Sequence, residues 1–311
     1  MKNAVCWKNK SFSVGLIVCF MLLISACTPG NGPVGKSNSF NEIFVADNSS
    51  GNVLVFDYNA NGAATPLRTI TGLSSPDNVA VDQVNNELFV YCMGDSTVKV
   101  FSRTADGAAA PLRTITGIGG SGDIIGLVVD PVNNELFLAN GTTVVVYARD
   151  ANGTDTPLRT ITGFDNVRGL ALDTTNNELF VADWGAYEIY VLSRTADGAA
   201  TPLRTITGFG NSLQGLALDL INNELFVGFS DGDCLMVFSR TATDATTPLR
   251  TITVSPSYLE GVAVAPDQNE LFVSDVNSNS IYAFSRTADG ETAPLRTITG
   301  LNTPLGIALG P

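Results

Sequence analysis

The chain has 311 residues, 44% of them hydrophobic, and its 30 acidic residues exceed its 17 basic ones to give a net charge of −13. A charge of this sign argues against a nucleic-acid partner and against adsorption to an anionic membrane surface. The sequence contains no histidine, which excludes Ser-His-Asp catalysis, histidine general bases and imidazole-bound zinc.

Residues 1–26 are predicted to be an export signal rather than part of the fold. Lys2, Lys8 and Lys10 give a basic start, and an almost wholly apolar run extends from Ser13 to Ala26. This run is shorter than the roughly 20 apolar residues that a membrane-spanning helix needs. An uncleaved membrane anchor is the alternative interpretation.

The end of this leader, LISAC at residues 23–27, resembles the lipobox of bacterial lipoproteins. The resemblance implies that Cys27 is acylated, with palmitate among the acyl groups, and becomes the mature N-terminus. Two or more acyl chains give lasting membrane attachment. Thr28 stands where an inner-membrane retention signal would usually show Asp, which by family analogy favours the outer membrane of a bacterial cell envelope.

Residues 27–39 are rich in Pro, Gly, Asn and Ser, a composition that cannot bury a core and predicts a flexible tether. The folded domain is therefore expected over residues 40–311. Its most conspicuous feature is the heptapeptide PLRTITG, which begins at Pro66 and returns, with one change at Val254, at intervals of 45 or 46 residues. The six copies begin at Pro66, Pro111, Pro157, Pro202, Pro248 and Pro294. A fixed period of this length predicts a solenoid, a propeller or an array.

One repeat unit, from Gly169 to Gly208, contains four apolar segments of strand length separated by turn residues. The segments are GLALD (strand A), ELFVAD (B), IYVLSR (C) and PLRTIT (D), and none shows the 3.6-residue period of a helix. Four antiparallel strands with two apolar faces predict a sheet that is buried against a copy of itself on each side. That is a propeller blade.

The number of strand B segments predicts an all-β, six-bladed propeller. The chain opens on a strand B near Asn41 and closes on an unpartnered strand A at residues 306–309. We therefore expect the C-terminal strand A to join the N-terminal strands B, C and D, which closes the ring and removes free sheet edges. The six repeated PLR arginines are expected to pair with the equally repeated acids of the blades, rather than to form a ligand-binding array.

The segments GLALD, NNELFVAD and VFSR resemble the repeats of NHL-type six-bladed propellers, over the whole folded region. That family shows a strand of alternating hydrophobic residues ending in Asp, then a turn, then a strand ending in V-A-D. WD40 propellers fit less well, because the chain has no GH…WD signature.

Candidate binding residues are found where the six copies disagree. The residue before the glycine position of strand A differs in every unit, as Asp77, Ile125, Arg168, Gln214, Glu260 and Leu305. In propellers strand A lines the central channel, so these positions should surround its mouth. We expect a polar site edged by aromatic residues, formed by Asp77, Arg168, Gln214, Glu260, Trp184, Tyr187, Phe229 and Tyr258. Neutral drift of the loops is the alternative for each of these residues.

Two functions remain open. The first is a non-catalytic, lipid-anchored scaffold that binds a protein, glycan or small molecule at the channel mouth. The second is a calcium-dependent hydrolase of the lactonase or phosphotriesterase kind, because some six-bladed propellers hold Ca²⁺ in the channel with hard oxygen ligands. The candidate ligands would be Asp77, Asn78, Asp231, Asp233 and Glu260. Arg168 at the same mouth would repel a cation, which favours the first function.

Overall fold

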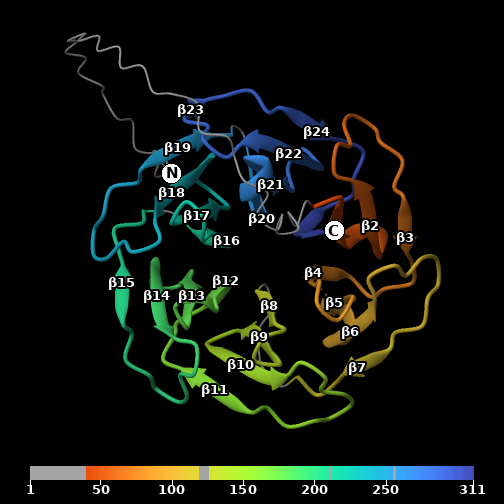
Figure 1. The fold of residues 1–311 in the computed structure, drawn as a ribbon, viewed down its shortest axis with the longest axis horizontal. Coiled ribbons are helices and arrows are strands. Elements are labelled where there is room, and N and C mark those ends of the chain that lie inside the picture. Colours follow the sequence, from red (N-terminus) through yellow and green to blue (C-terminus); the bar gives the residue numbers. More distant parts are fainter. Residues whose placement is uncertain (1–39, 119–125, 211, 255–256) are drawn as a thin grey trace, which may run out of the picture.

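The computed structural model describes residues 40–118, 126–210, 212–254 and 257–311. Within them the chain forms six sheets arranged around a central axis, and in each sheet the innermost strand faces that axis (Figure 1). The predicted six-bladed β-propeller of four-stranded antiparallel blades is confirmed.

The first three blades along the chain follow the predicted order from the axis outward. Blade 1 contains β25 (Pro304–Gly310), β1 (Glu42–Asp47), β2 (Asn52–Asp57) and β3 (Arg68–Ile70). Blade 2 contains β4 (Pro76–Asp82), β5 (Glu87–Cys92), β6 (Thr97–Ser102) and β7 (Arg113–Ile115). Blade 3 contains β8 (Leu127–Asp130), β9 (Glu135–Asn140), β10 (Thr143–Ala148) and β11 (Arg159–Thr162).

The remaining three blades repeat this order. Blade 4 contains β12 (Val167–Asp173), β13 (Glu178–Asp183), β14 (Glu188–Ser193) and β15 (Arg204–Ile206). Blade 5 contains β16 (Leu213–Asp219), β17 (Glu224–Phe229), β18 (Cys234–Ser239) and β19 (Arg250–Thr253). Blade 6 contains β20 (Leu259–Ala265), β21 (Glu270–Asp275), β22 (Ser280–Ser285) and β24 (Arg296–Ile298), while the short β23 (Gly290–Glu291) pairs with β19 of blade 5.

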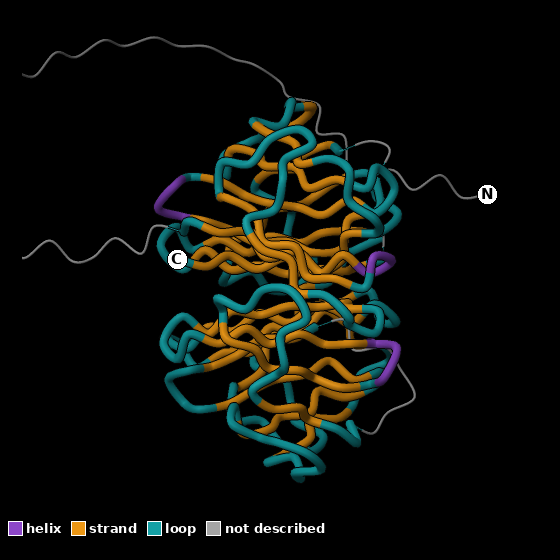
Figure 2. The backbone as a smooth tube through the Cα atoms, turned by 90° about the vertical axis from the view of Figure 1, so that its right-hand side faces the viewer, coloured by secondary structure: helices purple, strands orange, loops and turns teal. Residues whose placement is uncertain are grey.

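Loops and turns form the two faces of the ring (Figure 2). The 3₁₀ helices η1 (Asn48–Ser50) and η2 (Met93–Asp95) connect second and third strands, whereas η3 (Pro266–Gln268) connects a first strand to a second. The repeated Asn-Asn turns explain the tight connection between first and second strands. In blade 4, Asp173 accepts hydrogen bonds from the backbone and side-chain nitrogens of Asn176 at 2.8 and 2.7 Å, and Asn177 adopts a left-handed conformation (φ 58°) that Asn tolerates well.

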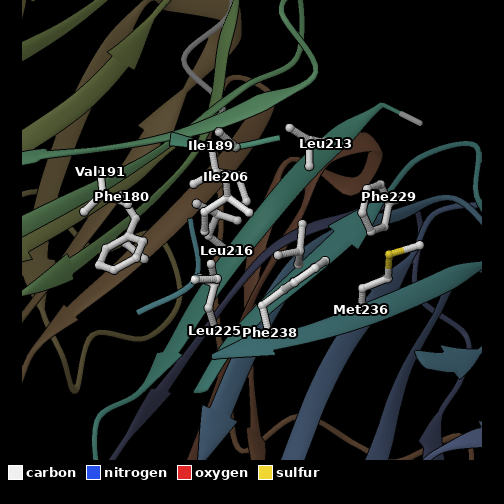
Figure 3. Packing of buried hydrophobic residues seen from close by; sticks show 14 of the residues in the cluster. Phe180, Ile189, Val191, Ile206, Leu213, Leu216, Leu225, Phe229, Met236 and Phe238 are labelled. Atoms are coloured by element: carbon white, nitrogen blue, oxygen red, sulfur yellow. The ribbon is translucent and has the colours of Figure 1, made fainter. Parts of the chain in front are cut away.

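The apolar core lies between neighbouring blades. One cluster takes Phe180 and Ile189 from blade 4 and Leu216, Leu225 and Phe238 from blade 5 (Figure 3). Each sheet is therefore covered on both faces, which is why its strands lack a consistently polar face.

The ring is closed by β25, as the unpartnered C-terminal segment predicts. β25 pairs with β1 in antiparallel register, with Gly310 opposite Glu42 and Ile307 opposite Val45. A second closure lies at the periphery of the ring, because Ile298 of blade 6 forms a parallel bridge with Gly62, which lies between β2 and β3 of blade 1. Equivalent bridges link all the remaining pairs of adjacent blades. The outer strand PLRTITG therefore also connects each blade to the next.

The repeated arginines form ion pairs with the repeated glutamates on one face of the ring, as expected. Arg204 binds Glu178 of its own blade through two hydrogen bonds of 2.5 and 2.9 Å. The same carboxylate accepts a 2.8 Å hydrogen bond from Arg240, which ends the third strand of blade 5. Five glutamates have this arrangement, each pairing with one arginine of its own blade and one of the following blade.

The sixth glutamate, Glu270, lies where the end of the chain meets its beginning. It pairs with Arg296 at 2.7 Å, but Tyr58 takes the place of the second arginine. The Arg296 guanidinium lies 5.6 Å from the centre of the Tyr58 ring, which is a cation–π distance. Burial and the neighbouring Glu270 raise the pKa of the Tyr58 hydroxyl, so this residue remains neutral at the closure.

Candidate functional site at the channel mouth

Four of the predicted residues gather at the start of the innermost strands. Asp77, Gln214 and Glu260 line a cavity of about 320 Å³ on the axis, together with Asn78 and Leu305. Arg168 immediately precedes Gly169, which lines the same cavity. Ile125 lies outside the described residues. The cavity is bounded by the innermost strands of all six blades, which surround the axis in Figure 1.

Glycine brings the mouth residues of adjacent blades together. A Cβ atom at Gly169 would lie 2.1 Å from the carbonyl oxygen of Gln214, and one at Gly215 would lie 2.2 Å from that of Glu260. Because neither position has room for a side chain, the inner strands approach more closely than other residues would allow. The channel is therefore narrow at the level of its polar residues. Blade 2 departs from this pattern, with Asn78 at the glycine position.

Glu260 shows that charges on different blades interact across the mouth. Burial and the negative charge of Asp77 raise the pKa of Glu260 to about 8, although Arg168 and a hydrogen bond from Tyr258 act in the opposite direction. Burial and Glu260 in turn raise the pKa of Tyr258, and Arg168 partly offsets this. Asp77, Arg168 and Glu260 come from blades 2, 4 and 6 and form one electrostatic unit.

Arg168 lies against an aromatic surface on blade 4. Its guanidinium is 5.6 Å from the centre of the Trp184 ring, and the Trp184 and Tyr187 rings are 6.4 Å apart. Tyr187 is 43% exposed and Tyr258 is 36% exposed, so both can contact a partner at the rim.

Two buried polar atoms at the mouth lack hydrogen-bond partners among the described residues, namely Nε of Arg168 and Oε1 of Gln214. Buried polar groups are normally paired, and leaving one unpaired costs about 1–3 kcal/mol. Nε is likewise unpaired in seven repeated arginines of the blades, so Oε1 of Gln214, which lines the cavity, is the more specific sign of a missing partner.

The structure corrects the placement of Phe229. Its side chain is fully buried between blades 4 and 5 and lines a separate apolar cavity, so it is not part of the rim. Phe229 is the last residue of the second strand in blade 5. Asp47, Asp183 and Asp275 occupy the same position in other blades. That position faces the neighbouring loop rather than the channel.

The proposed oxygen ligands for calcium do not assemble into a site. Asp231 accepts hydrogen bonds from the backbone N–H and the hydroxyl of Ser212, and Asp233 accepts one from the backbone N–H of Ser257. Both carboxylates thus hold loops in place. No group of three or more metal-binding side chains is present in the described part of the chain. Asp77 and Glu260, with Arg168 beside them, do not match the six to eight oxygen ligands that Ca²⁺ takes.

Cys27 and the leader lie outside the described residues, so lipidation stays a prediction. None of the helices within residues 40–118, 126–210, 212–254 and 257–311 is long and apolar enough to cross a membrane.

Comparisons with known proteins support the fold and no finer assignment. No protein-family model matches the sequence, and no curated protein matches it significantly. Among solved structures, the chain is similar to one from a nidogen/laminin complex (TM-score 0.67, 15% identity, covering 87% of this chain and 98% of that one). It is also similar to a functionally unknown protein from Desulfotomaculum acetoxidans DSM 771 (TM-score 0.64, 12% identity, 87% and 99% covered).

A third similar structure is the WD40 β-propeller domain of Doa1 (TM-score 0.59, 14% identity, 87% and 86% covered). All three identities are low, so these similarities show a shared β-propeller fold and no more. The closer resemblance of the repeats to the NHL family remains a prediction from the sequence.

Proposed function

We propose that this protein is an exported scaffold, anchored to the bacterial cell envelope through acylated Cys27, that binds a partner at its channel mouth without catalysing a reaction. The observation that carries the proposal is the mouth itself. Charged and amide side chains from separate blades converge on one cavity, and Gln214, which lines it, retains an unpaired buried polar atom. The scaffold around them is held by repeated ion pairs.

The rim favours a protein partner. Trp184, Tyr187 and Arg168 belong to the residue types that contribute most to protein–protein binding energy, and they are adjacent on blade 4. The similar chain in the nidogen/laminin complex is itself part of a protein assembly.

Site-specific photo-crosslinking in cells tests this function. A photoreactive amino acid at Tyr187, beside the mouth, should yield an adduct of defined mass, and the same group at Val84, which is 73% exposed on a turn of the opposite face, should not. Arg168→Ala should reduce the Tyr187 adduct at least tenfold, because one buried charged hydrogen bond is worth about 1.5–3 kcal/mol. Equal adducts from both faces, or an adduct insensitive to Arg168→Ala, would argue against binding at the mouth.

Cys27→Ser should release the protein from the membrane fraction if the anchor is as proposed.

A further inference from the structure

A second cavity lies between blades 4 and 5, away from the channel. It has a volume of about 370 Å³ and is lined by Phe209, Phe229, Met236 and Phe238 and by the loop of residues 245–248. Phe229, Met236 and Phe238 are all buried, whereas the loop residues 245–247 are exposed. The cavity therefore combines a deep apolar wall with access from solvent. Figure 3 shows Phe229 and Met236 at one end of the apolar cluster.

The cavity wall is aromatic and carries no charged side chain. The Phe209 ring centre is 6.1 Å from that of Phe229 and 5.4 Å from that of Phe238, the latter at an interplanar angle of 75°. Edge-to-face contacts at such distances are the preferred arrangement of aromatic rings. Met236 adds a polarisable sulfur, which also makes favourable contacts with rings. The polar groups of the lining are threonine hydroxyls and backbone amides.

Two other blades place a tyrosine at the position of Met236, whereas blades 1, 2 and 3 have Leu54, Lys99 and Val145 there. Met236 is equivalent to Tyr190 in blade 4 and to Tyr282 in blade 6, since each stands three residues before the serine of the Ser-Arg pair at the end of the third strand. The Tyr190 ring packs 5.7 Å from Phe164, the counterpart of Phe209. The Tyr282 ring packs 6.0 Å from Phe284, the counterpart of Phe238. Blade 5 keeps both neighbouring rings but lacks the tyrosine.

A second substitution makes the same cavity more apolar. In blade 4, Asp183 stands where blade 5 has Phe229, and it accepts backbone hydrogen bonds from Asp165 and Asn166 at 2.8 Å. Blade 5 instead anchors the equivalent loop with Asp231, through Ser212. The corresponding cavity between blades 2 and 3 is open too, but it contains Asn140, Asp155 and several threonines. Of these two cavities, only the one between blades 4 and 5 has an apolar lining.

We propose that the cavity between blades 4 and 5 is a binding site for a small neutral molecule with an aromatic ring, which takes the place of the tyrosine side chain found in blades 4 and 6. Its volume falls within the 300–1,000 Å³ range of small-molecule sites, which are largely apolar with a few polar groups. A charged ligand is disfavoured because nothing in the lining would compensate for its desolvation. This site is independent of the channel mouth.

The test uses p-cresol, the free counterpart of a tyrosine side chain, and the full-length protein with ¹³C-labelled methionine methyl groups. Addition of p-cresol should shift the Met236 methyl resonance in a saturable way and leave that of Met93, in η2 of blade 2, unchanged. p-Hydroxybenzoate, which is charged at neutral pH, should bind at least tenfold more weakly. This measurement on the unaltered sequence does not depend on any variant folding correctly.

Two matched variants locate the site. Met236→Tyr should fill the cavity with the chain's own ring and weaken p-cresol binding at least tenfold, without lowering the melting temperature. Tyr190→Met is the control: blade 4 has Asp183 and Leu192 where blade 5 has Phe229 and Phe238, so this variant should add no second p-cresol site. No saturable shift of Met236, unchanged affinity in Met236→Tyr, or tighter binding of 1-heptanol than of p-cresol would overturn the proposal, the last because it would indicate a site for an alkyl chain.

Discussion

Removal of β25, by ending the chain after Thr303, is expected to abolish the cooperative unfolding transition of the whole propeller. β25 is the innermost strand of blade 1, and its loss exposes the backbone edge of β1 and one wall of the channel. It also removes Ile307 and Leu309 from the core between blades 6 and 1. Because every blade is covered by its two neighbours, an open ring leaves apolar faces in water. Differential scanning calorimetry of the truncated chain should show no native-like peak.

A circular permutant provides the matched control. Moving residues 304–310 to a position before Asn41, joined by an Asn-Asn turn like those of blades 2 to 5, keeps every strand but makes blade 1 continuous. This permutant should regain a cooperative transition and the circular dichroism spectrum of the original chain. If the truncated chain melted like the intact protein, closure by β25 would contribute nothing to stability.

Glu178→Gln is expected to destabilise the ring by about 3 kcal/mol, because breaking a buried ion pair leaves uncompensated charge. Glu178 is the shared acceptor of Arg204 and Arg240, and the side chains of all three residues are at most 17% exposed. Arg240 also pairs with the buried Asp173 at 3.2 Å, so the substitution leaves Arg204 without a carboxylate partner and Arg240 with one of its two. Urea denaturation at pH 7 measures the loss as a shift in the midpoint.

Glu270→Gln is the control for this charge effect. Glu270 has the same position in blade 6, but its partners are one arginine and the neutral Tyr58. Its replacement leaves Arg296 without a carboxylate partner but disturbs no second arginine, so it should cost less than Glu178→Gln. Equal costs for the two variants would show that the second arginine is energetically irrelevant. Added salt should change the difference little, since the pairs are shielded from solvent.

The sequence predicts the fold well because every level of its repeat agrees. The spacing of PLRTITG gives the number of blades, and the unpartnered first and last segments give the closure by β25. The pairing of the PLR arginines with blade acids was also expected from their equal number. The sequence does not predict that each glutamate joins two adjacent blades. Contact between the second strand of one blade and the third strand of the next depends on how the blades stack.

The site was harder to predict, for reasons that particular residues show. Asp77, Gln214 and Glu260 were found because strand A has a known place beside the axis. The varying loop that begins at Phe229 predicts a place on the rim, but this position, equivalent to Asp183, turns toward a neighbouring loop. No sequence motif marks the apolar cavity between blades 4 and 5. The cavity exists because blade 5 has Met236 where blades 4 and 6 have the larger ring of a tyrosine.

The most direct test of the mouth as one coupled polar site is the titration of Glu260, followed by ¹³C NMR of its side-chain carboxyl. The group should titrate near pH 8, higher still in Arg168→Ala and lower in Asp77→Asn. Since the pKa in the folded state lies above the unfolded value of 4.5, Glu260 contributes stability that is complete at low pH and is lost as the pH rises toward 8. A pKa near 4.5 that neither substitution moves would mean that the three residues do not meet, and would contradict the proposed site.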